Sequence, residues 1–176
     1  MGEREKVREK EPSQQDEGKH YEATLQLYAA ARERAKTGKI VIRAKDLPWR
    51  QGRMGYTKHF LSWQMPEAAL ENWICFIHDV KVHSGKHRHQ GGINLFVLEG
   101  EGYTIVDGKK VELEKGDLIV LPVKPRGCEH QHFNKVPGKT AKWMAFEYSP
   151  FIGVLGNVFE HVENSPDWKT EKQTSA

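Results

Sequence analysis

The sequence predicts an all-β barrel or sandwich, preceded by one helix and followed by a second, short one. From residue 39 onward, short runs rich in β-branched and aromatic residues alternate with Gly, Pro and Asp-Gly turn signals. Before residue 39 and again after Pro150, apolar residues recur at helical rather than alternating spacing. A chain of 176 residues with 38% hydrophobic residues can bury one sizeable core, so we expect a single domain.

The first 38 residues divide into a tail and a helix. Residues 1–19 are densely charged and almost lack large apolar side chains, so we expect a flexible charged tail. In residues 20–38, Tyr21, Leu25 and Tyr28 recur at i, i+4 and i+7, and a glycine follows at the position of a C-terminal cap. The pattern predicts an amphipathic helix whose apolar stripe packs either over the barrel or against a second subunit.

Short strands are predicted throughout the middle of the chain, and their number is typical of a barrel or sandwich. Their runs span residues 40–43, 59–63, 73–82, 93–100, 102–108, 109–114, 117–122 and 141–148. Asp107 and Gly108 both tolerate positive φ, so this pair predicts a two-residue hairpin turn.

The barrel unit is expected to span residues 39–165, with a helix near its end. The segment PFIGVLGNVFEHV, residues 150–162, has apolar residues at roughly helical spacing and predicts a helix packed on the barrel. Residues 166–176 are expected to form a polar tail.

Charge and cysteine content exclude some classes of protein. Lys and Arg total 27 against 24 for Asp and Glu, too small an excess to indicate nucleic-acid binding. Cys75 and Cys128 are too few for a disulfide framework and are expected to be buried free thiols. Neither a signal peptide nor a membrane span is apparent, so we expect no membrane association and a cytoplasmic location.

Two histidine clusters indicate a metal site. His87 and His89 are two residues apart, so on a strand both imidazoles point to one face while Arg88 points away. A third ligand must come from another strand, and the cluster at residues 128–134 lies at a suitable distance downstream. The spacing therefore predicts a divalent metal held by imidazoles from two strands.

Residues 87–134 resemble the two sequence motifs of the cupin family. The stretch HRHQGGINLFVLEGEGYTIVDG is similar to the first motif, and GDLIVLPVKPRGCEHQHFN to the second. Gly116, Pro122, Gly127, His130 and Asn134 occupy the spaced positions of the second motif. The resemblance implies a double-stranded β-helical (jelly-roll) barrel, a metal near its wider mouth held by His87, His89 and His130, and a homodimer.

The details resemble ring-cleaving gentisate, salicylate and 1-hydroxy-2-naphthoate dioxygenases, which share the H-R-H and H-x-H-x-N patterns. The usual glutamate of the first cupin motif is missing here, since its places hold Ile93 and Asn94. A set of three neutral imidazoles remains, which suits an anionic substrate oxygen. The chain departs from this group in its length, in having Leu95 where an arginine usually meets the substrate carboxylate, and in three extra residues near Lys124.

His132 allows two interpretations because it lies two residues from His130 and shares its face on a regular strand. It could replace His130 as the ligand, or it could be an acid/base beside the metal. The Gly-x-x-His-x-x-x-Asn spacing selects His130 as the ligand, so we expect His132 to be catalytic.

Other residues are candidates for the substrate pocket. Asn94 could approach the metal or bond across the pleat, and Lys124 and Arg126 could bind a carboxylate or be merely solvated. Aromatic candidates also have an ordinary core interpretation. They are Phe96, Trp143 and Phe146, of which the last two face opposite ways on a regular strand.

Three functions are compatible with these features. The first is a non-haem Fe(II) dioxygenase that acts with dioxygen on an aromatic ring or a similar small enolisable substrate. The second is a non-oxidative metal-dependent isomerase or lyase, and the third is a barrel that binds a small molecule without turnover. Iron is the expected metal, although three imidazoles also accept manganese, nickel, copper or zinc.

Overall fold

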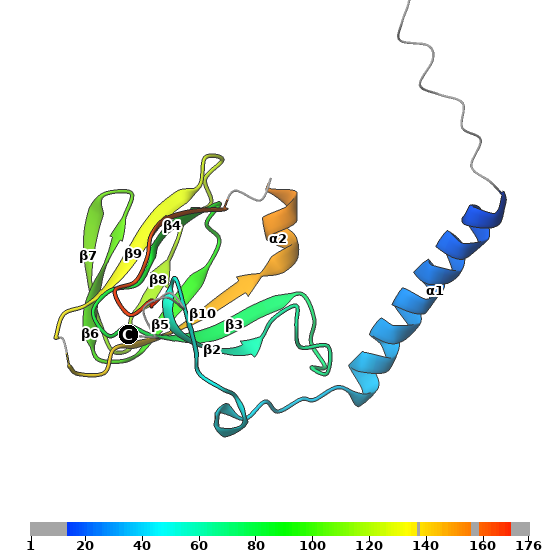
Figure 1. Ribbon diagram of the computed structural model, residues 1–176, viewed down its shortest axis with the longest axis horizontal. Helices are drawn as coiled ribbons and strands as arrows, with labels where there is room; N and C mark the ends of the chain where they lie inside the picture. The colour runs from blue at the N-terminus through cyan, green and yellow to red at the C-terminus, as the bar shows by residue number, and fades with distance from the viewer. Residues whose placement is uncertain (1–13, 137, 156–158, 170–176) are drawn as a thin grey trace, which may run out of the picture.

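The computed structural model describes residues 14–136, 138–155 and 159–169, and its strands form two antiparallel sheets (Figure 1). The six-stranded sheet has the order β1-β2-β3-β10-β5-β8, and the five-stranded sheet the order β11-β4-β9-β6-β7. The first sheet comprises β1 (Arg50–Gly52), β2 (Gly55–Leu61), β3 (Trp73–Asp79), β5 (Asn94–Glu99), β8 (Leu118–Val120) and β10 (Lys142–Tyr148). The second comprises β4 (Lys86–His89), β6 (Glu101–Val106), β7 (Lys109–Glu114), β9 (Cys128–Asn134) and β11 (Phe159–Glu163). The chain crosses repeatedly between the sheets, as the predicted jelly-roll barrel requires.

The hydrophobic core lies between the sheets. Alternating inward residues of β5 and β10 supply much of it, with Leu95 and Val97 from one strand and Trp143 and Ala145 from the other. The remaining core residues are Val80, Ile93, Leu113, Ile119, Leu121 and Cys128. Cys128 and Cys75 are free and buried, as the sequence predicts.

The hairpin prediction is confirmed. Val106 pairs with Lys109, so Asp107 and Gly108 alone form the turn between β6 and β7. Their φ values of 47° and 80° are both positive, as a type I′ turn needs.

The N-terminal helix is longer than predicted, and its apolar stripe does not follow one of the two expected packings. Helix α1 spans Gln14–Thr37, so it begins inside the expected tail of residues 1–19, whose first 13 residues lie outside the described part. Figure 1 shows α1 projecting away from the barrel, and Tyr21, Leu25 and Tyr28 are exposed. Its stripe therefore does not pack over the barrel in this chain. No helix within the described residues has the length and apolarity of a membrane span.

Two further segments differ from the prediction. Residues 40–43 form no strand, because a 3₁₀ turn (η1, Ala44–Asp46) follows directly and Ile40 and Val41 are exposed. The helix predicted within residues 150–162 is short: α2 covers Ser149–Val154, and Phe159–Glu163 is strand β11. Strand β11 hydrogen-bonds to the edge of β4 that would otherwise be free. This pairing satisfies backbone N–H and C=O groups of β4, a requirement that the spacing of apolar residues in the sequence does not reveal. The expected polar tail is described only to residue 169.

Candidate metal centre

The three predicted metal ligands lie on two neighbouring strands. On β4, His87 and His89 are buried and face the interior, whereas Arg88 turns outward and pairs with Glu129 at 3.1 Å. On β9, His130 is the register partner of His87. The third imidazole thus comes from the strand hydrogen-bonded to the H-x-H strand.

The three rings are close enough to share one ion. Their centroids are 4.2 Å apart for His87 and His130, 4.7 Å for His89 and His130, and 5.3 Å for His87 and His89. One nitrogen from each ring lies within 4.8 Å of the other two. Within the described residues, this trio forms a candidate three-histidine metal site.

Burial keeps the three imidazoles neutral. Desolvation lowers the pKa of His89 to about 4 and that of His130 to about 3, and it holds the pKa of His87 well below its usual range. Neutral rings present nitrogen lone pairs, as metal ligation requires.

The surroundings of the rings also fit a metal. The Nδ1–H of His130 donates to the Cys128 carbonyl at 3.1 Å, which orients that ring and leaves the lone pair of its Nε2 for a metal. The Gly91 N–H donates to Nδ1 of His89 at 3.1 Å and fixes the orientation of that ring. The Nδ1 atom of His87 is buried without a hydrogen-bond partner among the described residues. A divalent ion is the group that a buried, neutral imidazole trio of this kind accommodates.

His132 lies beside the trio and not within it. It faces the interior two residues beyond His130, and the ring centroids of these two residues are 5.4 Å apart. Its Nδ1 atom is 2.8 Å from the Thr104 hydroxyl, and its ring lies edge-on to Trp143 at 4.9 Å. Burial holds its pKa well below the usual range. The spacing argument that favoured His130 over His132 as ligand therefore agrees with the arrangement of the rings.

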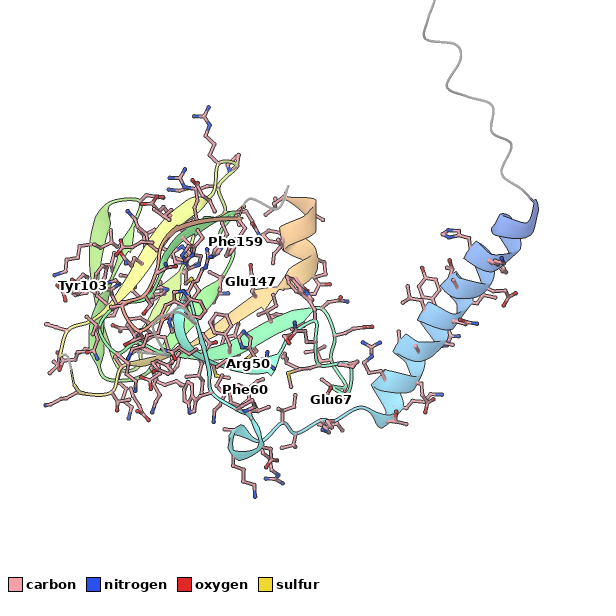
Figure 2. The ribbon with its side chains drawn as sticks, viewed as in Figure 1. Arg50, Phe60, Glu67, Tyr103, Glu147 and Phe159 are labelled. Atoms are coloured by element: carbon pink, nitrogen blue, oxygen red, sulfur yellow. The ribbon has the colours of Figure 1, made fainter. Side chains whose placement is uncertain are left out.

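The histidines line a cavity of about 510 Å³ between the sheets. Its apolar walls include Ile74 and Phe76 from β3, Ile93 just before β5, and Leu95 on β5. Polar groups line it as well: Thr57, His59, His78, Gln90, Glu147 and the four histidines of β4 and β9. Two further lining residues are labelled in Figure 2, Glu147 on β10 and Phe159 at the start of β11. The cavity can therefore enclose a small, largely apolar molecule beside the imidazole trio.

None of the six predicted pocket residues lines this cavity. Asn94, Phe96 and Phe146 are on the outer face of the six-stranded sheet, exposed to solvent. Lys124 forms an ion pair with Asp107 and borders a different cavity, and Arg126 is an exposed loop residue.

Trp143 lies in the core and is fully buried. Its indole ring contacts the ring of His132 edge-on and does not line the cavity. The side chains of Trp143 and Phe146 point to opposite faces of β10, as the spacing predicts.

Sequence reasoning missed several lining residues because they come from strands distant in sequence. His78 is buried, hydrogen-bonds the Met54 carbonyl at 2.9 Å, and has a pKa lowered to about 4 by burial. Glu147 lies in the cavity wall, and burial raises the pKa of its carboxyl to about 7. Gln90 is 1% exposed, and its Oε1 has no hydrogen-bond partner among the described residues. Alternation from the inward Trp143 would have placed Glu147 on the inner face.

Comparisons with known proteins give the class of this domain. The profile of the Cupin domain family matches residues 77–147, which include the imidazole trio and span β3 to β10. Together with the jelly-roll fold and the histidine site, this match supports a resemblance of this part of the chain to the cupin family.

Among curated proteins, part of this chain is similar to gentisate 1,2-dioxygenases. The enzyme of a Streptomyces species is 35% identical over 89 residues, which cover 50% of this chain and 23% of the relative. The enzyme of a Ralstonia species is 45% identical over 47 residues, which cover 26% of this chain and 12% of the relative. The chain thus matches less than a quarter of the length of either relative.

Solved structures share the fold. A variant of salicylate 1,2-dioxygenase from Pseudoaminobacter salicylatoxidans, in complex with gentisate, gives a TM-score of 0.51 at 22% identity, covering 82% of this chain and 38% of that one. A variant of the Streptomyces protein PAC13 with uridine gives a TM-score of 0.52 at 10% identity, covering 73% and 95%. At these identities the likeness is one of fold.

Proposed function

We propose that the protein is a metal-dependent dioxygenase that acts on a small, largely apolar substrate, with iron(II) as its metal. The observation that carries the proposal is the buried trio of His87, His89 and His130 in the wall of a cavity of about 510 Å³. Three neutral ligands leave coordination positions open on the cavity side. The similarity to gentisate 1,2-dioxygenases supports oxidative chemistry over other cupin activities.

The chain would contribute binding, orientation and proton transfer. A bound iron(II) ion supplies Lewis acidity and redox chemistry toward substrate oxygen atoms and dioxygen. His87, His89 and His130 hold the ion, and apolar walls that include Phe76 and Leu95 exclude water from the bound substrate.

His132 is suited to move a substrate proton. Its Nδ1 is engaged with Thr104, which leaves Nε2 as the ring nitrogen available to a bound molecule. Because burial keeps the ring neutral near pH 7, it would act first as a base.

The same neutral histidine favours a second candidate, a non-oxidative isomerase or lyase. In that reaction the metal would polarise a carbonyl while His132 transfers the proton. Such an enzyme needs no dioxygen, so oxygen consumption separates the two functions.

The test begins with protein purified without air, followed by metal analysis and oxygen uptake against hydroxylated aromatic compounds and diketones. Wild-type protein should hold about one iron per chain and consume oxygen with at least one substrate class. His87→Ala, His89→Ala and His130→Ala should each lose the metal, and His20→Ala, which removes an exposed histidine of α1, should retain it. Turnover without oxygen consumption would favour the isomerase or lyase, and full metal in all three variants would remove the proposed site.

A further inference from the structure

The cavity contains one carboxylate and no buried cation among its described lining residues. Glu147 is the carboxylate, and Arg53 is the single lysine or arginine. Arg53 lies on the exposed turn between β1 and β2. A guanidinium in that position keeps its hydration, so it neutralises a buried anion poorly.

Glu147 is held inside the wall by the strand that carries it. On β10, the side chains of Trp143, Ala145 and Glu147 alternate toward the interior, and the first two are fully buried. The register partner of Glu147 is Ile74, which also lines the cavity. Figure 2 shows Glu147 on the side of the barrel nearest α2, where Ile152 borders the same cavity.

No described residue forms an ion pair or hydrogen bond with the Glu147 carboxyl. Its register partner, Ile74, has an apolar side chain and supplies no donor to the carboxyl. A partly buried carboxyl without a partner costs stability, and a ligand that donates to it recovers that cost.

We propose that the cavity selects a flat, apolar molecule whose polar head group is a hydrogen-bond donor, a protonated amine above all, and that Glu147 binds this head group. This inference rests on the proposed function, since it names the substrate class of the same site. Away from the metal, a carboxylate head group would meet the Glu147 carboxyl and the apolar side chain of Leu95, and no buried lysine or arginine among the described lining residues. Aromatic acids should therefore be poor ligands.

The inference can be tested by calorimetric binding of two matched probes to metal-loaded protein without oxygen. Tyramine and 3-(4-hydroxyphenyl)propionate share a phenol ring and a two-carbon spacer, and they differ in their ammonium or carboxylate group. Wild-type protein should bind tyramine at least about tenfold more tightly, in line with a charge-assisted hydrogen bond in a partly buried site. Glu147→Gln should lower tyramine affinity about tenfold without weakening the acid, and Glu147→Lys should reverse the preference.

Glu112→Gln is the matched control, because it removes a carboxylate from the exposed surface of β7 and should leave both affinities unchanged. Circular dichroism of each variant establishes that the barrel is folded. Equal affinities, tighter binding of the acid, no binding of tyramine, or an unchanged preference in folded Glu147→Gln would overturn the inference. Because binding is measured without oxygen, a tyramine preference together with no later oxygen uptake on any of the hydroxylated aromatic compounds and diketones would refute the proposed dioxygenase and leave the role of Glu147 standing.

Discussion

The two ends of the barrel interior use the space between the sheets in opposite ways. At one end, Val97, Leu113, Ile119, Leu121 and Trp143 pack into a core of apolar side chains. At the other, histidines, a glutamine and a glutamate surround a cavity. Burial of the apolar end favours folding, whereas each buried polar group at the cavity end costs free energy unless it finds a partner. Stability and function are therefore assigned to different ends of one fold.

The largest expected effect lies in the packed end. Trp143→Ala should lower the free energy of unfolding by about 3–5 kcal/mol, because it removes a fully buried indole and leaves a cavity. Chemical denaturation of the metal-free protein measures this loss in the free energy of unfolding. The matched control is Phe146→Ala, three residues away on the outer face, which should cost less than about 1 kcal/mol. Similar losses for the two variants would contradict the division between inner and outer faces.

At the cavity end, His132→Gln should impair turnover and spare the metal. Removal of a general acid/base lowers turnover by roughly a hundredfold, while His87, His89 and His130 remain to hold the ion. Metal analysis and steady-state rates of the same preparation measure both effects. If His132→Gln loses metal while His130→Gln retains it, the ligand assignment is reversed; if neither metal nor turnover changes, His132 has no catalytic role.

Acid should destabilise the cavity end through His78. Burial lowers its folded pKa to about 4, below the ordinary value of 6.5, so the unfolded chain binds more protons between these values. The stability that His78 provides is complete above pH 6.5 and is lost as pH falls from 6.5 toward 4, by at most about 1.4 kcal/mol per pH unit.

Denaturation of metal-free protein at several pH values tests this effect. His78→Gln retains a donor for the Met54 carbonyl and should show a shallower loss below pH 6.5. His20→Gln, on the exposed helix α1, should behave as wild type. Identical slopes in all three proteins would show that His78 does not carry the effect.

The smallest effect is expected for the N-terminal helix. Deletion of residues 1–37 should change the free energy of unfolding by less than about 1 kcal/mol, because the apolar side chains of α1 are exposed and its ion pair, Arg34 with Glu71, lies at the surface. Light scattering of both proteins tests whether the helix mediates a dimer instead. A dimer that dissociates on deletion would show that the exposed stripe packs against a second subunit.

The sequence predicted local geometry well. Alternation on a strand placed His87 and His89 on one face, the spacing of the second motif selected the histidine that lies beside them, His130, and Asp107-Gly108 predicted the hairpin. Each of these features depends on residues within a few positions of one another or on a motif with fixed spacing.

The pocket could not be predicted in the same way. Its walls combine β2, β3, β10 and the segment after α2, so membership depends on which strands face one another across the barrel. Lys124 and Phe96 were plausible by chemistry and face elsewhere, whereas Glu147 drew no attention because a lone carboxylate in a strand has no motif. Strand β11 was mistaken for helix because its role is to complete the edge of β4, a tertiary requirement.

The pairing of β11 with β4 has a consequence for how the chain matures during synthesis. Strands β4 and β9, which carry the three imidazoles, precede β11 in the chain, so β4 has one unpaired edge until Phe159–Glu163 has also emerged from the ribosome. An unpaired strand edge can pair with another chain, and we expect the pairing with β11 to remove this route to aggregation beside the metal site.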